Sequence, residues 1–273
     1  SGLFAKEEII SPIIKTKLSF KAMLEPLSLK PFRQYLTMFL LTQIAMAVMS
    51  GLFFFYIDFY IVKDLTFNDV PNMVGLIGAA LMFFTQIVAL PVYLKMIEKK
   101  SKAYTYRFGA LIWIISALGI LLIPANAAPW IIYLLAVIMG FGISAPGLIP
   151  HTMFGDVADA GQLKFKKRLE GQMSGFDNFI NQIAQALGLS TAMMILGFAD
   201  FRERDLTVPE PVNWQPDSAL LAIRLIMALT PLLLLSIAIF VSYRYKIDAK
   251  EQQRIKQEIA NDSQLNTEEQ VAG

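Results

Sequence analysis

Six long apolar segments constrain the fold of this chain more than any other feature of its sequence. A helix needs about 20 residues to cross the roughly 30 Å hydrocarbon core of a bilayer. The segments that reach or approach this length cover residues 35–61, 74–94, 108–123, 129–148, 171–198 and 220–243. Four consecutive leucines at 232–235 do not fit the alternating pattern of a membrane-spanning β-strand. The sequence therefore predicts an all-α membrane protein with six transmembrane helices.

The composition agrees with a membrane protein and excludes several functions. Of the 273 residues, 55% are hydrophobic and 17% are charged, whereas soluble domains carry about a quarter charged residues. A net charge of only +2 gives no support for binding to nucleic acid. The chain contains no cysteine, which excludes disulfides and thiolate chemistry.

The sequence carries no recognisable enzymatic signature. It has no H-E-x-x-H or G-x-S-x-G motif, so neither a metalloprotease nor a serine hydrolase is indicated. Its single histidine, His151, falls short of the roughly three or four protein ligands that hold a zinc ion. We therefore expect no enzyme, no metal site and no cofactor.

The basic residues predict how the helices are oriented. Twenty of the 24 Lys and Arg residues lie before the first segment, after the second, after the fourth and after the sixth. These four regions share one side of the membrane, and the positive-inside rule makes that side the cytosol. We expect an integral protein of the bacterial inner membrane with both termini cytosolic and in contact with membrane lipids.

The flanking regions differ in character from the apolar bundle. Residues 1–34 mix basic and apolar side chains with three prolines and predict a cytosolic connector near the membrane surface. The bundle then covers residues 35–243, and residues 244–273 form a polar cytosolic tail. The sequence predicts a short helix around residues 251–254 and disorder from Asn261 onward.

The region between the fourth and fifth segments carries a specific motif. Residues 155–164 read GDVADAGQLK and residues 167–171 read KRLEG. This pattern resembles the cytosolic loop of the glycoside–pentoside–hexuronide:cation symporters, a family of the major facilitator superfamily that includes the melibiose permeases. Weaker matches are Lys30-Pro31-Phe32-Arg33 and the QALG run at 185–188. The matches follow the order of the C-terminal six helices of that family.

The resemblance implies a fold and a function. A complete member has twelve helices in two six-helix halves, with a substrate cavity between them, so this chain is expected to be the C-terminal half-bundle and its partner the N-terminal half. The resemblance also implies uptake of a small polar solute, such as a glycoside or sugar acid, driven by a proton or sodium gradient. The alternatives are transport of an amphiphilic lipid-like substrate and a non-transporting membrane scaffold.

Polar residues on the fifth segment are the main candidates for a substrate site. At about 100° per residue they fall within an arc of roughly 140°. The stripe consists of Ser174, Asp177, Asn178, Asn181, Gln182 and Gln185. We expect Asn178, Asn181, Gln182 and Gln185 to bind substrate and Asp177 to couple a cation or proton. The alternative is that these residues only hold helices together. Family members often carry a lysine where this chain has Gln182.

A second polar face is predicted on the first segment, where Gln43, Ser50, Phe54 and Asp58 share one side. Gln43 is a candidate substrate ligand. Asp58 is a candidate for cation or proton coupling near the outer interface. The alternative for Asp58 is a solvated helix-end carboxylate that pairs with Lys63.

Charged residues of the motif predict a cytosolic gate. Asp156 and Asp159 precede a basic run that includes Lys167 and Arg168. With the family resemblance in view, we expect these four residues to form ion pairs with the N-terminal half. The alternative is a solvated loop whose carboxylates cap a short helix.

Overall fold

The computed structural model describes residues 24–62, 73–125, 127–202 and 215–272. Six of the helices in these ranges are long and apolar enough to cross a membrane, which confirms the predicted number of spans. The spanning helices are α2 (Lys30–Phe55), α3 (Met73–Lys99), α4 (Lys102–Gly119), α5 (Pro129–Phe165), α6 (Glu170–Phe198) and α7 (Asp217–Tyr243). The described ranges contain no strand.

Several helices begin earlier or end later than the apolar segments. The first helix starts at Lys30, follows a short turn η1 (Glu25–Ser28), and continues past Phe55 as the π-helical segment η2 (Tyr56–Ile61). The third starts at Lys102, where the Ser101 side chain accepts a hydrogen bond from the Tyr104 amide at 3.1 Å, and ends in η3 (Ile120–Leu122). Basic first turns lower the hydropathy of these ends without opposing helix formation, because Lys and Arg are good helix formers.

The largest difference from the sequence prediction concerns α5. The prediction ended this span at residue 148 and placed a loop after it, whereas the helix runs on to Phe165. At 1.5 Å per residue its 37 residues reach about 55 Å, well beyond the hydrocarbon core. The extension contains Pro150, Gly155 and Gly161, which disfavour a helix, and its helical state therefore depends on packing and not on propensity. The chain turns only at Lys166, which adopts a left-handed conformation with φ of 53°.

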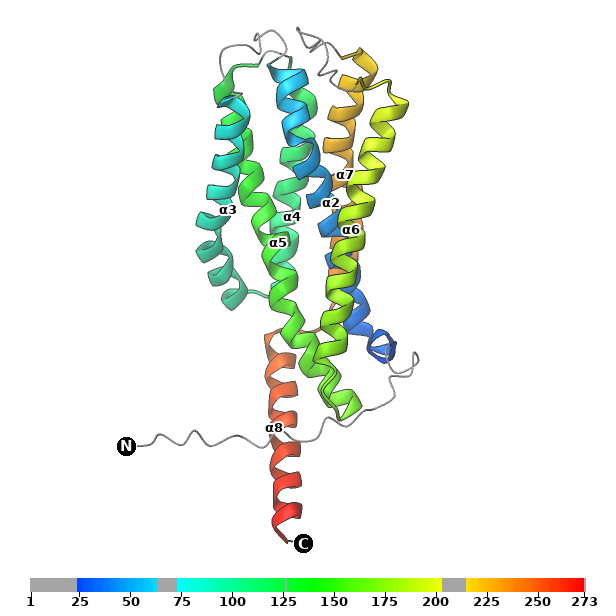
Figure 1. Ribbon diagram of the computed structural model, residues 1–273. Helices are drawn as coiled ribbons and strands as arrows, with labels where there is room; N and C mark the ends of the chain where they lie inside the picture. The colour runs from blue at the N-terminus through cyan, green and yellow to red at the C-terminus, as the bar shows by residue number, and fades with distance from the viewer. Residues whose placement is uncertain (1–23, 63–72, 126, 203–214, 273) are drawn as a thin grey trace, which may run out of the picture.

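The helices pack as two groups of three (Figure 1). In one group α5 lies between α3 and α4, and in the other α2 lies between α6 and α7. The two groups meet mainly where α4 packs on α7 and, to a lesser extent, where α2 packs on α5. At the end of the bundle where η2 lies, Arg224 of α7 contacts both η2 and η3. Its guanidinium lies 4.5 Å from the centre of the Tyr60 ring, and its Nη2 donates to the Leu121 carbonyl at 2.6 Å.

Glycines on α5 allow close approach of its neighbours. A Cβ atom added to Gly142 would lie 2.5 Å from the backbone nitrogen of Trp113 on α4. One added to Gly140 would lie 2.4 Å from the carbonyl oxygen of Met82 on α3. Small residues at helix contacts are how membrane bundles gain van der Waals packing, because lipid supplies no hydrophobic drive between helices.

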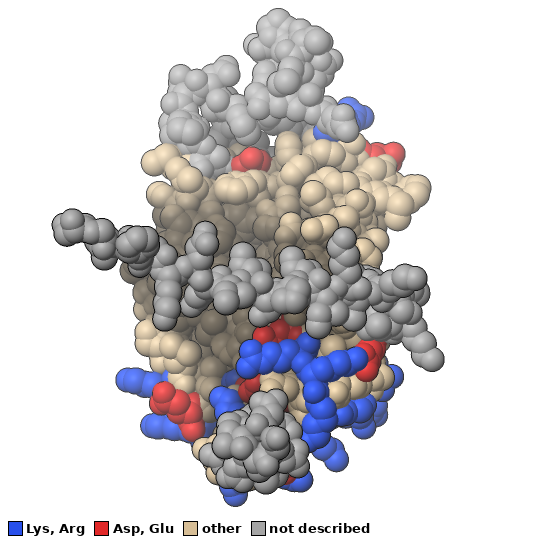
Figure 2. Space-filling view, turned by 60° about the horizontal axis from the view of Figure 1, so that its bottom comes forward, with Lys and Arg blue, Asp and Glu red and all other residues tan. Residues whose placement is uncertain are grey.

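Basic side chains gather at one end of the molecule, next to a broad belt with almost no charged side chain (Figure 2). We call it the apolar belt, because the spanning helices form it. We call the end with the basic side chains the basic end; it is where α2 begins and α7 ends. Its described basic residues within or between the spans are Lys30, Arg33, Lys95, Lys99, Lys100, Lys102, Arg107, Lys164, Lys166, Lys167, Arg168 and Arg244.

The tail forms helix α8 (Ala249–Ala272), which projects from the basic end (Figure 1). Asp248 caps it, because its Oδ1 accepts hydrogen bonds from the amides of Lys250 and Glu251 at 3.0 and 2.9 Å. The helix continues beyond Asn261, where the sequence predicted disorder. Its Glu, Gln, Ala and Lys content favours a helix, and Ile255 is buried against the bundle.

We predict that Gly142→Leu destabilises the bundle by about 1–3 kcal/mol, the usual cost of overpacking a filled contact. The new side chain would push α4 away from α5, because the Trp113 backbone occupies the space for its Cβ. Thermal unfolding in detergent measures this effect. Gly155→Leu is the matched control on the same helix, since nothing lies within 4 Å of a Cβ at Gly155. Equal melting temperatures for the two variants would contradict the packing argument.

Candidate functional site

The polar stripe on α6 divides into two parts. The packing face of the helix lies against α2, and it consists of Met173, Ala184, Gly188, Ala192 and Leu196. Ser174, Asp177 and Asn181 lie beside this face and are half-buried, whereas Asn178, Gln182 and Gln185 are exposed. The structure therefore exposes three of the four predicted substrate residues on one side of α6 and places the fourth, Asn181, with Ser174 and Asp177 on the side toward α2.

The exposed part of the stripe is a row of amides with free hydrogen-bonding capacity. Within the described chain, Asn178 and Gln182 make no side-chain hydrogen bond. Gln185 donates only a long bond of 3.5 Å to Asn181 Oδ1. Each amide offers two N–H donors and a carbonyl acceptor. This surface can therefore hydrogen-bond the hydroxyl or carboxylate groups of a polar solute.

Asp177 is tied to the neighbouring helix. Its Oδ1 accepts a short hydrogen bond from the hydroxyl of Tyr35, which is fully buried on α2. This bond fixes the rotation of α6 relative to α2. Sequence reasoning missed Tyr35, because 142 residues separate the partners and a tyrosine at the start of an apolar segment is an ordinary interfacial residue.

The two predicted coupling carboxylates lie at opposite ends of the bundle. Asp58 belongs to η2 and is half-buried, whereas Asp177 contacts Tyr35 near the basic end. Tyr35 and Asp58 are 23 positions apart on one continuous helical stretch, which corresponds to about 35 Å. The two carboxylates therefore do not form one cation site. Lys63, the predicted partner of Asp58, lies outside the described residues.

Gln43 lies half-buried near the middle of α2 and makes no hydrogen bond within the described chain. Three residues further along, Met46 lines a cavity of about 290 Å³ between α2, α3 and α5. Gln86 of α3 lines the same cavity. Its main-chain carbonyl accepts a hydrogen bond from the Ser144 hydroxyl at 2.9 Å. Sequence reasoning passed over Gln86, although a single Gln inside an apolar span was the available signal.

Asp156 is buried and fully engaged inside the chain. It lies on α5 and is 3% exposed. Lys102, at the start of α4, pairs with its Oδ2 at 2.6 Å and also donates to the Thr152 carbonyl at 2.7 Å. Gln252 of α8 donates to its Oδ1. The predicted loop around this residue is thus a helix, and the carboxylate joins three helices. Nearby, burial and the Asp156 charge raise the pKa of the Tyr245 phenol, which stays neutral.

The other gate candidates lie at the same end on the surface. Lys167 pairs with Glu25 of η1. Asp159, half-buried on α5, and Arg168, exposed in the turn before α6, have no hydrogen bond or ion pair with the described residues. The structure therefore separates the four predicted gate residues into two with partners inside the chain and two without.

His151 stands on the surface of α5, where its ring lies 5.5 Å from that of Phe39 in an edge-to-face contact. No group of three or more His, Asp or Glu residues in the described ranges is arranged to hold a metal ion.

The sequence model of a family described as MFS/sugar transport protein matches residues 15–249. The chain belongs to this family. Membership confirms the predicted resemblance to the cation symporters of the major facilitator superfamily and identifies an integral membrane protein.

Three relatives of the chain carry names that describe them as symporters. An uncharacterized symporter of Synechocystis is 32% identical over 67% of the chain, and one of Bacillus subtilis is 26% identical over 92%. A sodium-dependent lysophosphatidylcholine symporter of Xenopus tropicalis is 24% identical over 84%. The matches span only 33%, 51% and 41% of the respective relatives, so the chain covers about half of their length or less.

We predict that Lys102→Met destabilises the protein by on the order of 3 kcal/mol, because it leaves the buried Asp156 carboxylate without its cation. Unfolding in detergent measures the loss. Lys167→Met is the matched control, since that ion pair is exposed and worth about 1 kcal/mol or less. The double variant Lys102→Met/Asp156→Leu should recover most of the stability. A Lys102→Met protein as stable as the control would show that the pair contributes nothing.

Proposed function

We propose that the chain is the C-terminal half of a cation-coupled secondary transporter that takes up a sugar or a related small polar solute. The observation that carries this proposal is the row of exposed amides on α6. Asn178, Gln182 and Gln185 project from a helix that is otherwise apolar enough to span the membrane. A polar row facing lipid would be costly, because hydrocarbon provides no hydrogen-bond partner. These residues therefore face water or another protein surface.

A second half-bundle supplies such a surface. In this proposal an N-terminal six-helix half packs opposite α6 and leaves a substrate cavity at mid-membrane, as in rocking transporters. The length of the relatives, which is about twice that of the matched region or more, supports this partner. Tyr35 keeps the α6 amides aimed at the cavity by holding Asp177.

We assign coupling and gating within the same scheme. In this scheme Asp177 releases the hydrogen bond from Tyr35 when it binds a proton or a sodium ion. Asp58, at the opposite end of the bundle, binds the cation as it enters. Asp159 and Arg168 form the gate contacts with the N-terminal half, because they have no partner in the described chain. Asp156 and Lys167, which have such partners, hold the basic end together.

An amphiphilic, lipid-like substrate is the second candidate. The name of the Xenopus relative, a sodium-dependent lysophosphatidylcholine symporter, favours it. The two candidate substrates differ in how many of the α6 amides they contact. A sugar bonds several of them directly, whereas a lysolipid places at most its headgroup there. A non-transporting scaffold would show no uptake of either kind.

We also propose that the basic end faces the cytosol and that the protein resides in a bacterial inner membrane. The collection of Lys and Arg at this end supports the orientation. Both termini then lie in the cytosol, because α2 begins and α7 ends there.

The orientation is tested with single cysteines, which are absent from these 273 residues. We expect Ser218→Cys, at the exposed start of α7, to react in intact cells with a membrane-impermeant maleimide. Lys166→Cys, exposed at the basic end, should react only after the cells are permeabilised. The reverse pattern would overturn the proposed topology.

The substrate path is tested with apolar replacements on α6 in the complete transporter. We expect Asn178→Leu and Gln182→Leu to weaken uptake of radiolabelled glycosides or hexuronates by about 5- to 150-fold, because each removes one hydrogen-bonding group worth roughly 1–3 kcal/mol. Membrane expression should stay normal, since leucine is readily accepted in a bundle.

The matched control is Phe179→Leu, which lies on the same turn outside the stripe and is 59% exposed. Unchanged apparent affinity in both stripe variants, together with a lower melting temperature, would assign the stripe to helix packing. Selective loss of lysophosphatidylcholine uptake would favour the second candidate. Asp177→Asn should abolish the cation or pH dependence of uptake.

A further inference from the structure

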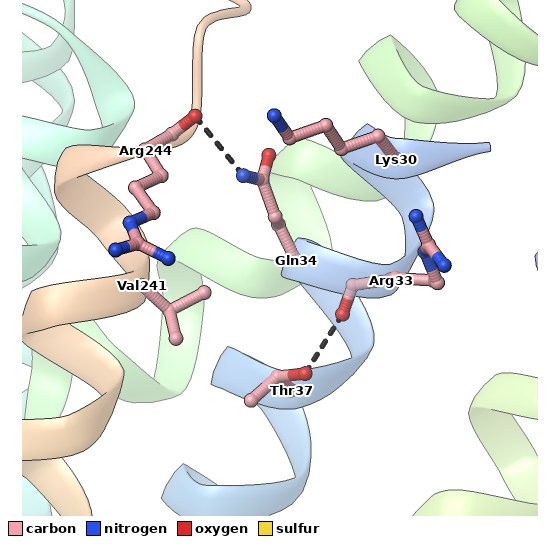
Figure 3. Close-up of a pocket in the computed structure, with 6 residues that line it drawn as sticks. All are labelled: Lys30, Arg33, Gln34, Thr37, Val241 and Arg244. Atoms are coloured by element: carbon pink, nitrogen blue, oxygen red, sulfur yellow. Dashed lines mark hydrogen bonds between the residues drawn. The ribbon is translucent and has the colours of Figure 1, made fainter.

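A cavity of about 370 Å³ opens at the basic end between the first turns of α2 and the last turn of α7 (Figure 3). The side chains that line it are Lys30, Arg33, Gln34, Thr37, Val241 and Arg244. Three of the six are cationic, two can form hydrogen bonds and none is acidic. The cavity is therefore a basic pocket at the boundary between the apolar belt and the charged end.

The cations of this pocket lack carboxylate partners such as those of Lys102, Lys166 and Lys167 at the same end. Within the described chain, Lys30, Arg33 and Arg244 form no ion pair. The described contact of the Arg244 side chain is with the Phe240 ring, whose centre lies 4.5 Å from the guanidinium carbon. The paired basic residues at the same end and on α8 are Lys102, Lys166, Lys167 and Arg254. The basic pocket thus has a concentrated positive charge that an external anion can neutralise.

The polar lining residues are already positioned by the backbone. Gln34 donates from its Nε2 to the Arg244 carbonyl at 3.0 Å, which links α2 to the end of α7 (Figure 3). Thr37 donates to the Arg33 carbonyl at 2.9 Å. The Gln34 bond connects the two walls of the pocket, and the Thr37 bond fixes a side chain within the α2 wall, so the cavity exists before a ligand arrives.

A mainly apolar groove lies deeper in the membrane between α2, α6 and α7, and its α6 wall includes Leu187, Thr191 and Ile195. It has a volume of about 330 Å³ and includes Ile44 and Val48 of α2 and Leu233 and Leu234 of α7. Thr37, at the pocket, and Ile44, at the groove, are seven residues apart on α2, which corresponds to about 10 Å. A charged site and an apolar site therefore follow each other along one helix seam.

We propose that this seam binds an anionic phospholipid of the adjacent leaflet, with its phosphate in the basic pocket and an acyl chain along α2 and α7 toward the groove. Basic pockets between membrane helices suit anionic headgroups, since each Lys or Arg near the surface adds attraction. A zwitterionic headgroup would bring an ammonium group against three cations. The site is separate from the α6 amide row and does not depend on the proposed transport activity.

The test compares three ligands on the 273-residue chain purified in detergent. We expect phosphatidylglycerol to raise the melting temperature and to remain bound in native mass spectra. Phosphatidylcholine with the same acyl chains should do neither, and inorganic phosphate should give no protection. Equal binding of the two lipids would overturn the proposal. Equal protection by inorganic phosphate would also overturn it, because the site would then recognise a free anion and not a lipid.

Variants locate the binding. Lys30→Gln/Arg33→Gln/Arg244→Gln should weaken phosphatidylglycerol binding by roughly 100-fold, the combined effect of three basic contacts. The matched control, Lys95→Gln/Lys99→Gln/Lys100→Gln, removes the same charge from exposed positions in the last turns of α3 and directly after it, at the same end, and should bind normally. Equal weakening in the control would mean general charge attraction and would overturn the site.

A third variant separates pocket shape from charge. Val241→Phe fills the cavity and keeps all three cations, so it should also lose phosphatidylglycerol selectively. This variant decides the matter if the triple substitution prevents folding. Normal lipid binding by a folded Val241→Phe protein would overturn the assignment to this pocket.

Discussion

Hydrocarbon offers no hydrogen bond to a polar group, and this constraint accounts for where the polar side chains of the bundle lie. Some are tied to another helix, as Asp177 is to Tyr35 and Thr42 is to Tyr106 at 2.7 Å. Others lie at the ends, where Arg224 and Lys102 find carbonyl or carboxylate partners. The exposed amides of α6 fit neither group. The described bundle alone therefore gives no structural explanation for these amides.

The close-packed contacts complement this polar arrangement. Glycines let the backbones of α3 and α4 approach α5, and Gly188 does the same between α6 and α2, where an added Cβ would lie 3.1 Å from the Ile44 carbonyl oxygen. Cavities nevertheless remain between the helices, one between α2, α6 and α7 and one between α2, α3 and α5. The open space of the bundle therefore lies next to α2, the helix that also carries Tyr35 and Gln43.

The sequence predicted the number and class of the helices, because long apolar runs report directly on membrane depth. It placed their ends poorly, since α2, α4 and α5 continue into charged turns that hydropathy excludes. The α6 stripe followed from helical periodicity, and the structure keeps Asn178 and Gln182 on the surface. Helical periodicity shows which residues share a face of one helix, but it does not show which helix that face contacts. The partners of Asp177 and Asp156 lie 142, 54 and 96 positions away, and nothing local in the sequence identifies them.

Helix α8 gives the protein a fixed spacer on its basic side. Its first turns are anchored, since Gln252 bonds the same Asp156 carboxylate that Lys102 neutralises and Ile255 is buried. Its 24 residues then extend over about 36 Å. A protein domain joined to the far end of α8 would be held away from the bilayer surface at a defined distance and direction. Because the anchor is on α5, such a domain would follow the movements of α5 and not those of α6.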